Sequence, residues 1–599
     1  MNLLSPMVLA PDPPQQPAPG NSPPPATPPR LRVDASLRVA QAGLLLLVAL
    51  LALFLAGPLL AVASQALQDA QGRFVGLANF IAYGRTPSLL GSLFNSLWVA
   101  ALVTALSVPL AFGFAYALQR CCVRGKPLLR AITLLPLLAP SLLAAISLIY
   151  WFGNQGVAKG LMQGLGIKQI YGAPGIVLAE CFAVLPHALM ILVTALAAAD
   201  GRLYEAAQAM GTSTWRRFVT ITLPGAKYGL ISAALVSFTL VVTDFGIPKV
   251  IGGNFGMLAT DVFQLVIGQQ DFQKGAVVAL LLLAPALLSF VVDRHVAARQ
   301  TAQLGARAVV YRPRRQPLRD GLATAYCLLV VAAVLAIIGM AVFASFATFW
   351  PYQLAPTLAH YTMGLVDAEV GSAFINSLLM ASGTALVGTT LVFSGAYLVE
   401  KTQPVAGSDA GAARWSPDTL LRSSLRLLAL LPMAVPGLVL GLGTIFFFNA
   451  PGNPLGGLYH TMALLTACTI THFYTTGHLT ALTALKALDA EFEAVSASLK
   501  VPFWVTLRRV SLPICMPALV DIARYFFINA MTTISAVVFL YSPETKVAAI
   551  AILNLDEAGE TGAAAAMAVL IMATSGVAML AFMALAAAVQ NKTQAWRHA

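Results

Sequence analysis

Apolar stretches separated by short polar segments run along almost the entire chain. A stretch of about 20 apolar residues crosses the hydrocarbon core of a bilayer, and twelve candidate spans of this kind are present. Their centres lie near residues 53, 105, 142, 186, 238, 283, 334, 386, 437, 470, 529 and 575. Several contain Pro or Gly, which membrane helices tolerate where neighbours satisfy the freed backbone groups. The pattern predicts an all-α membrane protein with twelve transmembrane helices.

The twelve spans form two similar sets of six. Asn95 and Asn376 each open an Asn-Ser pair, at an offset of 281 (376 minus 95), and LLPLLAP from Leu134 is matched by LLPMAVP from Leu430, at an offset of 296 (430 minus 134). An even number of spans in each repeat returns the chain to the side on which it began. We therefore expect two parallel six-helix repeats related by an axis along the membrane normal.

Charge and composition predict how the chain is divided and oriented. We predict a Pro-rich tail over 1–38, a first repeat over 39–293, a basic linker over 294–320, a second repeat over 321–590 and a C-terminal tail over 591–599. Lys and Arg stay on the cytoplasmic side, and a cytoplasmic N-terminus puts most of the 36 basic residues there. Both tails and the linker are therefore expected in the cytoplasm.

Composition excludes several classes of function. Hydrophobic residues make up 58% of the chain and charged residues only 10%, which is typical of a membrane protein. The net charge of +12 is spread over many loops without interleaved aromatic residues, so nucleic-acid binding is not expected. The phosphate-binding pattern G-x-x-x-x-G-K-[ST] is absent, as are nucleophile and zinc-protease motifs. We expect no catalytic residue, cofactor or metal site.

One polar segment occurs twice, each time between the fourth and fifth spans of a half. The first loop, Asp200–Pro224, reads DGRLYEAAQAMGTSTWRRFVTITLP, and the second loop, Asp489–Pro513, reads DAEFEAVSASLKVPFWVTLRRVSLP, at an offset of 289 (489 minus 200). In the first loop, helical spacing gives one apolar stripe made of Leu203, Ala206, Ala207 and Met210. Gly211 then permits a sharp turn. The repeated pattern predicts two short helices at an angle, rooted in two spans, which form a docking surface.

The first loop resembles the EAA loop of ABC importer permeases. In that family Glu-Ala-Ala is followed by a Gly and a closing Leu-Pro, and the matching residues are Glu205, Ala206, Ala207, Gly211 and Pro224. The resemblance implies the type I ABC importer permease fold. It also implies that this loop is a coupling helix, which docks on an ATPase subunit.

The second loop departs from the family pattern. Glu493 and Ala494 stand near the Glu-Ala-Ala positions, Lys500 replaces the glycine, and Pro513 keeps the closing Leu-Pro. We expect this loop to turn differently or to dock asymmetrically.

The resemblance also implies partners and a location. We expect two ATP-binding cassette subunits that use ATP and Mg, a periplasmic substrate-binding protein, and the bilayer of a bacterial inner membrane. The segment Phe245–Phe272, FGIPKVIGGNFGMLATDVFQLVIGQQDF, resembles permeases of 2-aminoethylphosphonate importers, within a group that includes ferric-iron permeases. The implied cargo is 2-aminoethylphosphonate. A ferric-iron or other small-solute ABC permease and a secondary active transporter are the alternatives.

Few ionisable or clustered polar residues fall within the spans. Asp244 ends the fifth span, and its counterpart at offset 289 is Thr533. The candidates for lining a pathway are Thr243, Asp244, Thr532, Thr533 and Ser535. Alternatively, Asp244 lies in headgroup water and Thr533 bonds its own helix backbone. Asp521 and Arg524, at i and i+3, are expected to pair at the inner edge of the membrane.

Overall fold

The computed structural model describes residues 35–164, 166–303, 309, 311–366, 368–402 and 417–593. The Pro-rich tail predicted over 1–38 lies outside the described residues up to position 34, and the tail predicted over 591–599 lies outside them from position 594. The described residues are almost entirely helical, so the all-α prediction is confirmed. The five domain boundaries stay predictions.

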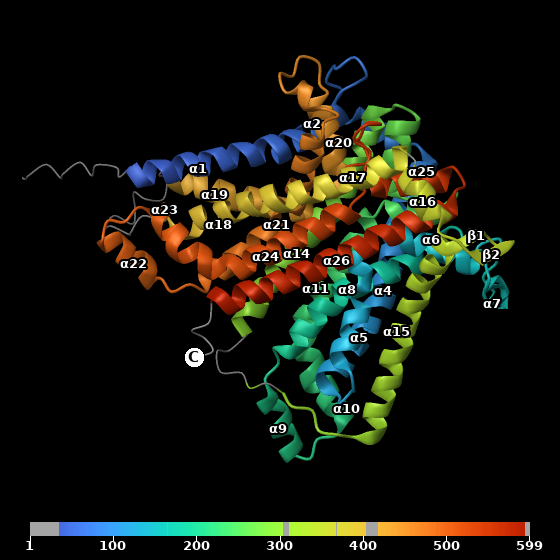
Figure 1. Cartoon of the computed structure of the whole chain (residues 1–599), viewed down its shortest axis with the longest axis horizontal. Helices are drawn as coiled ribbons and strands as arrows, with labels where there is room; N and C mark the ends of the chain where they lie inside the picture. The colour runs from blue at the N-terminus through green and yellow to red at the C-terminus, as the bar shows by residue number, and fades with distance from the viewer. Residues whose placement is uncertain are drawn as a thin grey trace, which may run out of the picture.

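The first half comprises the elements up to the linker (Figure 1). Here η marks short 3₁₀ or π segments. The elements are α1 Ala35–Leu51, η1 Ala52–Ala56, α2 Gly57–Ala66, α3 Ala78–Gly84, α4 Pro87–Arg120, α5 Lys126–Thr133, η2 Leu135–Leu138, α6 Ser141–Phe152, α7 Lys159–Gly164, α8 Ala173–Ala197, α9 Gly201–Ala209, α10 Thr214–Arg217, η3 Phe218–Thr222, α11 Leu223–Thr243, α12 Gly246–Ile251, α13 Leu258–Phe263, η4 Gln264–Gly268 and α14 Phe272–Gln303.

The second half repeats this order and adds a two-stranded hairpin. Its elements are α15 Pro317–Phe346, β1 Ala347–Phe349, β2 Gln353–Pro356, α16 Ala359–Val366, α17 Ala368–Gly383, η5 Thr384–Gly388, α18 Thr389–Lys401, α19 Pro417–Leu430, η7 Leu431–Ala434, α20 Gly437–Phe448, η8 Gly456–Leu458, α21 Met462–Lys486, α22 Glu491–Ser498, α23 Phe503–Thr506, η9 Leu507–Ser511, α24 Leu512–Thr532, α25 Ala548–Glu557 and α26 Thr561–Thr593.

Helix boundaries reproduce the three sequence offsets. The run from α17 to α18 starts and ends 281 residues after α4 (368 minus 87, 401 minus 120), and α20 lies 296 residues after α6 (437 minus 141). From α8 onward the offset is 289, because α21 and α26 start at that distance from α8 and α14 (462 minus 173, 561 minus 272). The internal duplication predicted from short motifs is therefore confirmed as a repeat of whole elements.

All twelve predicted centres lie in helical segments, but the described residues contain nine helices that are long and apolar enough to cross a membrane. Three centres differ. Near 142 the chain forms α5, η2 and the 12-residue α6, and near 437 the pair α19–η7 and α20 bends by 116°. Both breaks occur where Leu-Pro and a second Pro interrupt backbone hydrogen bonding. The segment near 470 is the continuous helix α21, which carries many Thr residues and two His residues.

The first helix of each half packs on the other half. Helix α1 lies beside α18 and α19, and α2 lies against α20, where the Gly443 position approaches the Pro58 carbonyl too closely for a side chain. Phe54 stacks on Phe448 with ring centroids 5.6 Å apart. In turn, α15 packs on α4, α5 and α6 of the first half. The two halves are thus joined by an exchange of helices.

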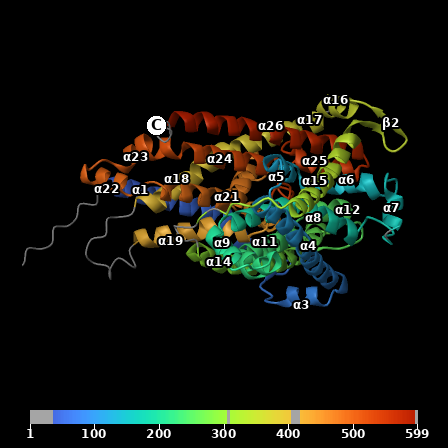
Figure 2. The ribbon, with the colours of Figure 1, turned by 90° about the horizontal axis from the view of Figure 1, so that it is seen from below.

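The two halves lie at an angle to each other. In Figure 1, α9 lies at the bottom and α22 at the left, whereas α6, α16 and α25 come together at the right. Figure 2 again puts α22 and α23 at one end and β2 and α7 at the other. We call the side that carries α9 and α22 the loop face. The halves meet at the opposite face and diverge toward the loop face.

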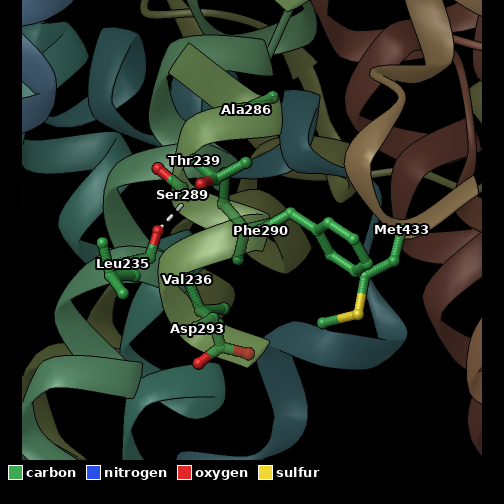
Figure 3. A pocket seen from close by; sticks show the side chains of 9 residues that line it. Leu235, Val236, Thr239, Ala286, Ser289, Phe290, Asp293 and Met433 are labelled. Carbon is green, nitrogen blue, oxygen red and sulfur yellow. Dashed lines mark hydrogen bonds between the residues drawn. The ribbon is translucent and has the colours of Figure 1, made fainter. Parts of the chain in front are cut away.

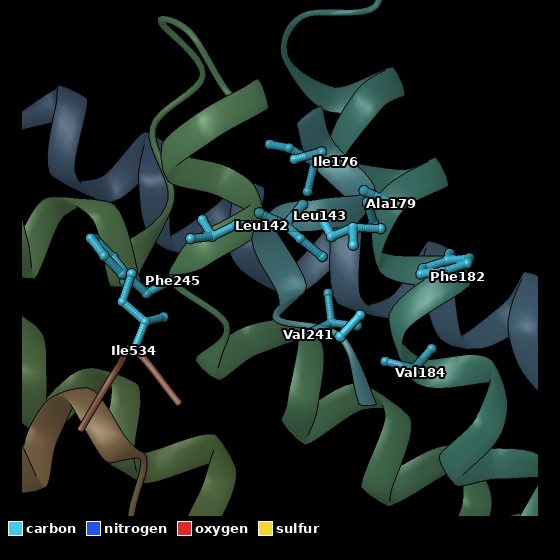
Figure 4. Close-up of a cluster of buried hydrophobic side chains, with 14 of the residues drawn as sticks. Leu142, Leu143, Ile176, Ala179, Phe182, Val184, Val241, Phe245 and Ile534 are labelled. Carbon is cyan, nitrogen blue, oxygen red and sulfur yellow. The ribbon is translucent and has the colours of Figure 1, made fainter. Parts of the chain in front are cut away.

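Contacts between the halves are well defined at that opposite face. Lys249 Nζ lies 2.8 Å from a carboxylate oxygen of Glu557, and the rings of Phe263 and Phe539 are 6.1 Å apart. One hydrophobic core runs through both halves here, and Figure 4 shows Ile534 of the second half beside Phe245. This shared core fixes the junction between the halves.

Candidate functional site: two repeated loops and a polar helix face

The first loop is built by two capping motifs. Helix α9 begins after Asp200, whose Oδ1 accepts the backbone N–H of Arg202 at 3.0 Å. It ends where the N–H of Thr212 bonds to the carbonyl of Ala207 at 3.0 Å, while Gly211 takes a φ of 70°. This is a Schellman motif, which requires a left-handed residue after the helix. The sharp turn predicted at Gly211 is confirmed.

The second loop repeats this backbone in spite of its different residues. Asp489 Oδ1 accepts the N–H of Glu491 at 3.0 Å, and the N–H of Val501 bonds to the carbonyl of Ser496 at 2.9 Å. Lys500 takes a φ of 52°, the left-handed conformation that Gly211 has in the first loop. The expectation of a different turn is wrong, because the Schellman hydrogen bond holds a non-glycine residue in that conformation.

The two loops expose matching apolar side chains. The apolar stripe predicted on α9 is divided, because Ala207 faces inward while Met210 is 76% exposed. Leu499, its counterpart at offset 289, is 70% exposed. Each loop exposes three large hydrophobic residues at equivalent positions: Leu203, Met210 and Trp215 in the first, and Phe492, Leu499 and Trp504 in the second.

The residues of the family motif lie around this exposed surface. In the first loop, Glu205, Ala206 and Gly211 are exposed, and Pro224 lies in the first turn of α11 after the π segment η3. In the second loop, Ala494 and Lys500 are exposed and Glu493 is half-buried, while Pro513 lies in the first turn of α24 after the π segment η9. The structure thus brings both sets to the loop face.

A buried arginine anchors the first loop. Arg120, the last residue of α4, is 3% exposed, and its guanidinium lies over the rings of Tyr204 and Tyr311 at 4.8 and 4.7 Å. Its Nη2 donates to the carbonyl of Leu196 at 2.8 Å. The hydroxyl of Tyr204 in turn lies 2.9 Å from that of Thr222. The anchor ties together α4, the end of α8, the loop helix and the start of α11.

An ion pair anchors the second loop at the same position. Lys401 ends α18 and corresponds to Arg120 at offset 281, and its Nζ lies 3.1 Å from a carboxylate oxygen of Glu493. Glu493 corresponds to Tyr204 at offset 289. The side chains of Lys401 and Glu493 are 8% and 24% exposed. A charge pair therefore replaces the cation–aromatic contact.

The linker between the halves straps the first loop. The N–H of Gly201 donates to the carbonyl of Val309 at 2.8 Å, and the N–H of Val309 donates to Asp200 Oδ1 at 3.3 Å. The pKa of the Asp200 carboxyl is lowered, mainly by the hydrogen bond from the Arg202 N–H and further by that from Val309. The linker thereby joins the N-terminus of α9 to the anchor at Tyr311.

The five predicted pathway residues are all partly or fully buried. Asp244 is half-buried, and its Oδ2 accepts the N–H of Ile247 at 2.8 Å. Thr533 is 8% exposed. Thr243, Thr532 and Ser535 are half-buried. A pathway role for these five residues stays a prediction.

Asp521 and Arg524 form the expected ion pair, and both lie on α24. Arg524 Nη2 lies 3.0 Å from Asp521 Oδ1, and the side chains are 31% and 47% exposed for Arg524 and Asp521. Arg524 lies eight residues before the end of α24 at Thr532, about 12 Å at 1.5 Å per residue. It therefore lies near the middle of helix α24. Charged groups at this depth face a bundle interior or a water-filled cavity.

The corresponding face of the first half borders a small cavity. Figure 3 shows this space of about 150 Å³ between α11 and α14, with Met433 of the second half on its far side. Thr239 and Asp293 line it, and Asp293 accepts a hydrogen bond from Ser232, the counterpart of Asp521. The face of α11 that matches the Asp521–Arg524 face of α24 thus packs against α14 of its own half. Within the described residues, no group of three or more His, Cys, Asp or Glu could hold a metal ion.

Two segments of the chain match one protein family. Residues 107–301 and 406–591 each match the family described as binding-protein-dependent transport system inner membrane component, and together they cover more than half of the chain. The chain belongs to this family. It is an ABC importer inner-membrane permease in which the family domain occurs twice.

Several curated relatives span most of this permease. A ferric transport system permease protein of Actinobacillus pleuropneumoniae is 28% identical over 492 residues, which cover 79% of this chain and 68% of the relative. A probable ABC transporter permease protein of Sinorhizobium fredii (strain NBRC 101917 / NGR234) is 26% identical over 525 residues, covering 84% and 88%. A molybdenum transport system permease protein of Escherichia coli (strain K12) is 33% identical over 152 residues, covering 25% of this chain and 66% of the relative.

Sequence reasoning missed the anchors of the permease loops. The cations at Arg120 and Lys401 end the second and eighth spans at the offset already found for those spans. That repetition was a signal, but it did not point to an anchor, because the positive-inside rule alone also puts basic residues at span ends. The linker residue Tyr311 gave no such signal, since no sequence pattern pairs it with Tyr204.

Proposed function

We propose that this permease is the translocation subunit of an ATP-driven importer and that its two loops bind two ATP-binding cassette subunits. One observation carries the proposal, which is that the two loops expose matching sets of large apolar side chains at the same face. Apolar patches of this kind on a polar loop are typical of protein-binding surfaces. ATP and Mg would be bound by the partners, and a periplasmic substrate-binding protein would deliver the cargo at the opposite face.

The anchors support a mechanical role for the loops. Each loop joins two spans directly, α8 and α11 in the first half and α21 and α24 in the second. Arg120 and Lys401 attach a third span to each loop. A force applied to α9 or α22 would therefore move three helices together. We assign the loop face and both termini to the cytoplasm, on the distribution of Lys and Arg.

The angle between the halves suits an inward-open state. The halves touch at the face opposite the loops, where Lys249 pairs with Glu557, and they diverge toward the loop face. Closure of an ATPase dimer would draw the two loops together. That movement would pivot the halves on the core shared around Phe245 and Ile534. The pathway would then open on the side of the binding protein.

The docking surface can be tested by removing its two tryptophans. We expect Trp215→Ala with Trp504→Ala to lower capture of the ATPase subunit encoded with this permease by more than about tenfold, because buried interface tryptophans are often hot spots. ATP-driven uptake into proteoliposomes should fall with it. Phe74→Ala, which removes an exposed aromatic residue at the opposite face, is the matched control. Uptake driven by a proton gradient without any ATPase would refute the proposal.

For the cargo we propose 2-aminoethylphosphonate. This molecule carries an ammonium group and a phosphonate group, which complement Asp521 and Arg524 in the middle of α24. The resemblance of segment Phe245–Phe272 to permeases of such importers supports the same cargo. Ferric iron is the second candidate, because relatives that span most of the chain are named ferric transport permeases.

Cargo identity is tested with the complete importer. Proteoliposomes that contain the permease, its ATPase and its binding protein are supplied with radiolabelled 2-aminoethylphosphonate or ferric iron. We expect phosphonate uptake, and its loss in Arg524→Gln without any loss of ATPase capture. Leu235→Gln, at the counterpart of Arg524, is the control. Iron uptake without phosphonate uptake would replace the proposed cargo while leaving the importer assignment intact.

A further inference from the structure

A large cavity lies where the exchanged helix α1 meets the second half. It measures about 550 Å³ and is bounded by α1 and η1 on one side and by η5, α18 and α21 on the other. Leu47, Phe54, Val387, Leu391 and Ile470 are among the residues that line it. It is separate from the loops and from the polar face of α24, so nothing in the transport mechanism accounts for it.

The lining offers water few polar groups: besides two threonines it contains only Tyr474, whose hydroxyl is buried without a hydrogen-bond partner among the described residues. The two threonines of the lining use their hydroxyls on their own helix, Thr466 Oγ1 donating to the Met462 carbonyl and Thr471 Oγ1 to the Ala467 carbonyl, each at 2.8 Å. A buried water needs two to four polar partners, and apolar cavities stay dry. An empty space of this size would lose the dispersion contacts of its whole lining. The cavity therefore calls for an apolar occupant.

The cavity opens to the bilayer and has the length of one leaflet. Val387 is 50% exposed and Ala463 is exposed, so the opening lies on the outer surface of the helical bundle. On α21 the lining runs from Met462 to Tyr474, twelve residues or about 18 Å at 1.5 Å per residue. Half of a hydrocarbon core of about 30 Å is about 15 Å. Met462 is at the end of α21 away from the loop face, which identifies the leaflet.

The equivalent place in the first half is closed by protein. There α15 packs on α4, and the Tyr326 hydroxyl donates to the carbonyl of Leu110 at 2.7 Å. Leu110 is the counterpart of Leu391 at offset 281. Gly113 provides the room, because a side chain there would lie 3.1 Å from the Tyr326 hydroxyl. In the first half, the ring of Tyr326 covers the position of Leu110. In the second half, the matching residue Leu391 borders the open cavity.

We propose that this cavity binds one acyl chain of a phospholipid from the leaflet at the face opposite the loops. The chain completes the packing between α1 and the second half, which the protein alone leaves open. The ligand class is a saturated or monounsaturated lipid tail, recognised by shape and apolarity, because no charged side chain lines the cavity.

The experiment fills the cavity and measures retained lipid. Val387→Trp and Ala467→Phe each place a large ring in the lining, and Leu106→Trp at the offset-281 counterpart of Val387 is the control, since both parent residues are 50% exposed. Each permease is purified in detergent and analysed by native mass spectrometry for bound phosphatidylethanolamine. We expect wild type and Leu106→Trp to retain a phospholipid that both filled variants lose.

Thermal stability provides a second readout that does not depend on one variant. After delipidation, added phosphatidylethanolamine should raise the melting temperature of wild type and of Leu106→Trp but not of the filled variants. Retention of lipid at wild-type levels in both filled variants would overturn the proposal. The proposal would also be overturned if the wild-type permease held no lipid and gained no stability from added lipid. The same holds if water or a helix of a second copy filled the cavity.

Discussion

The first and second loops have the same backbone and different supports. Both begin with an Asp cap and end in a left-handed residue, Gly211 in one and Lys500 in the other. Beneath that backbone, the first loop rests on Arg120 between two tyrosines, and the second rests on the Lys401–Glu493 pair. Duplication has kept the shape and the exposed apolar surface while exchanging the buried chemistry. The two loops therefore differ in their buried anchors and in some motif residues, but not in their backbone fold.

The largest expected effect comes from removing the first anchor. Arg120→Met should lower the free energy of opening of the first loop by about 3 kcal/mol, because two cation–aromatic contacts and a charged hydrogen bond are lost. Hydrogen exchange of the α9 amides measures this, with α22 as the internal reference. Arg120→Lys should restore only part of the protection, since an ammonium cannot lie flat between two rings. Equal protection of α9 in wild type and Arg120→Met would contradict the anchor.

The second anchor should give a smaller effect with a different signature. Lys401→Met is expected to loosen the second loop by about 1–2 kcal/mol, because the half-buried Glu493 loses its partner but keeps some solvent. A double-mutant cycle with Glu493→Gln, read from the exchange of α22 amides, should show coupling between the two side chains. Additive effects would mean that the pair contributes nothing to the loop.

The linker strap distinguishes the two loops further. Gly201→Ala puts a methyl group 3.0 Å from the Val309 carbonyl oxygen and should displace the strap. The free energy of opening of the strap should fall by about 1 kcal/mol. The second loop already has Ala490 at this position, where the described residues show no strap hydrogen bond. Ala490→Gly should leave both loops unchanged in hydrogen exchange. In the Gly201→Ala variant, faster hydrogen exchange confined to the amide at position 201 would mark the loss of the Val309 contact. Unchanged exchange at that amide would show that the strap tolerates the methyl group.

The turn residues should give the smallest effect. Lys500→Gly is expected to stabilise the second loop by about 0.5 kcal/mol, because relief of left-handed strain exceeds the extra backbone entropy of glycine. Gly211→Lys should cost the first loop a similar amount, since no atom lies within 4 Å of the added Cβ. Thermal unfolding of the two variants should shift in opposite directions. A shift in the same direction would mean that the two turns are not equivalent.

Local patterns predicted much of this structure. The capping residues at Asp200 and Asp489 and the turn at Gly211 follow from short-range chemistry, so the loops could be derived residue by residue. The offsets of 281, 296 and 289 could be found because short motifs survive in both halves. The left-handed conformation of Lys500 could not be predicted. It is imposed by the hydrogen bond from the Val501 N–H to the Ser496 carbonyl and not by the preference of lysine itself.

Long-range contacts account for what the sequence did not reveal. The contact of Arg120 with Tyr311 joins residues far apart in the chain, and no periodicity relates them. The course of α24 around Arg524 was also hard to predict, because the charged pair interrupts the apolar run within one continuous helix. The break before α6 was also missed, since composition alone does not distinguish a bent apolar segment from a straight one.

The exchange of first helices bears on how the chain is made. Helix α1 is synthesised well before its packing partners α18 and α19, which begin more than 330 residues after it ends (389 minus 51). Until α18 and α19 are synthesised, the face of α1 that will contact them must be exposed to lipid. The two exchanged helices are the most apolar of the nine straight spans found in the described residues. Their high hydropathy thus favours assembly, because it keeps an early helix stable in the bilayer until its partner helices in the second half are synthesised.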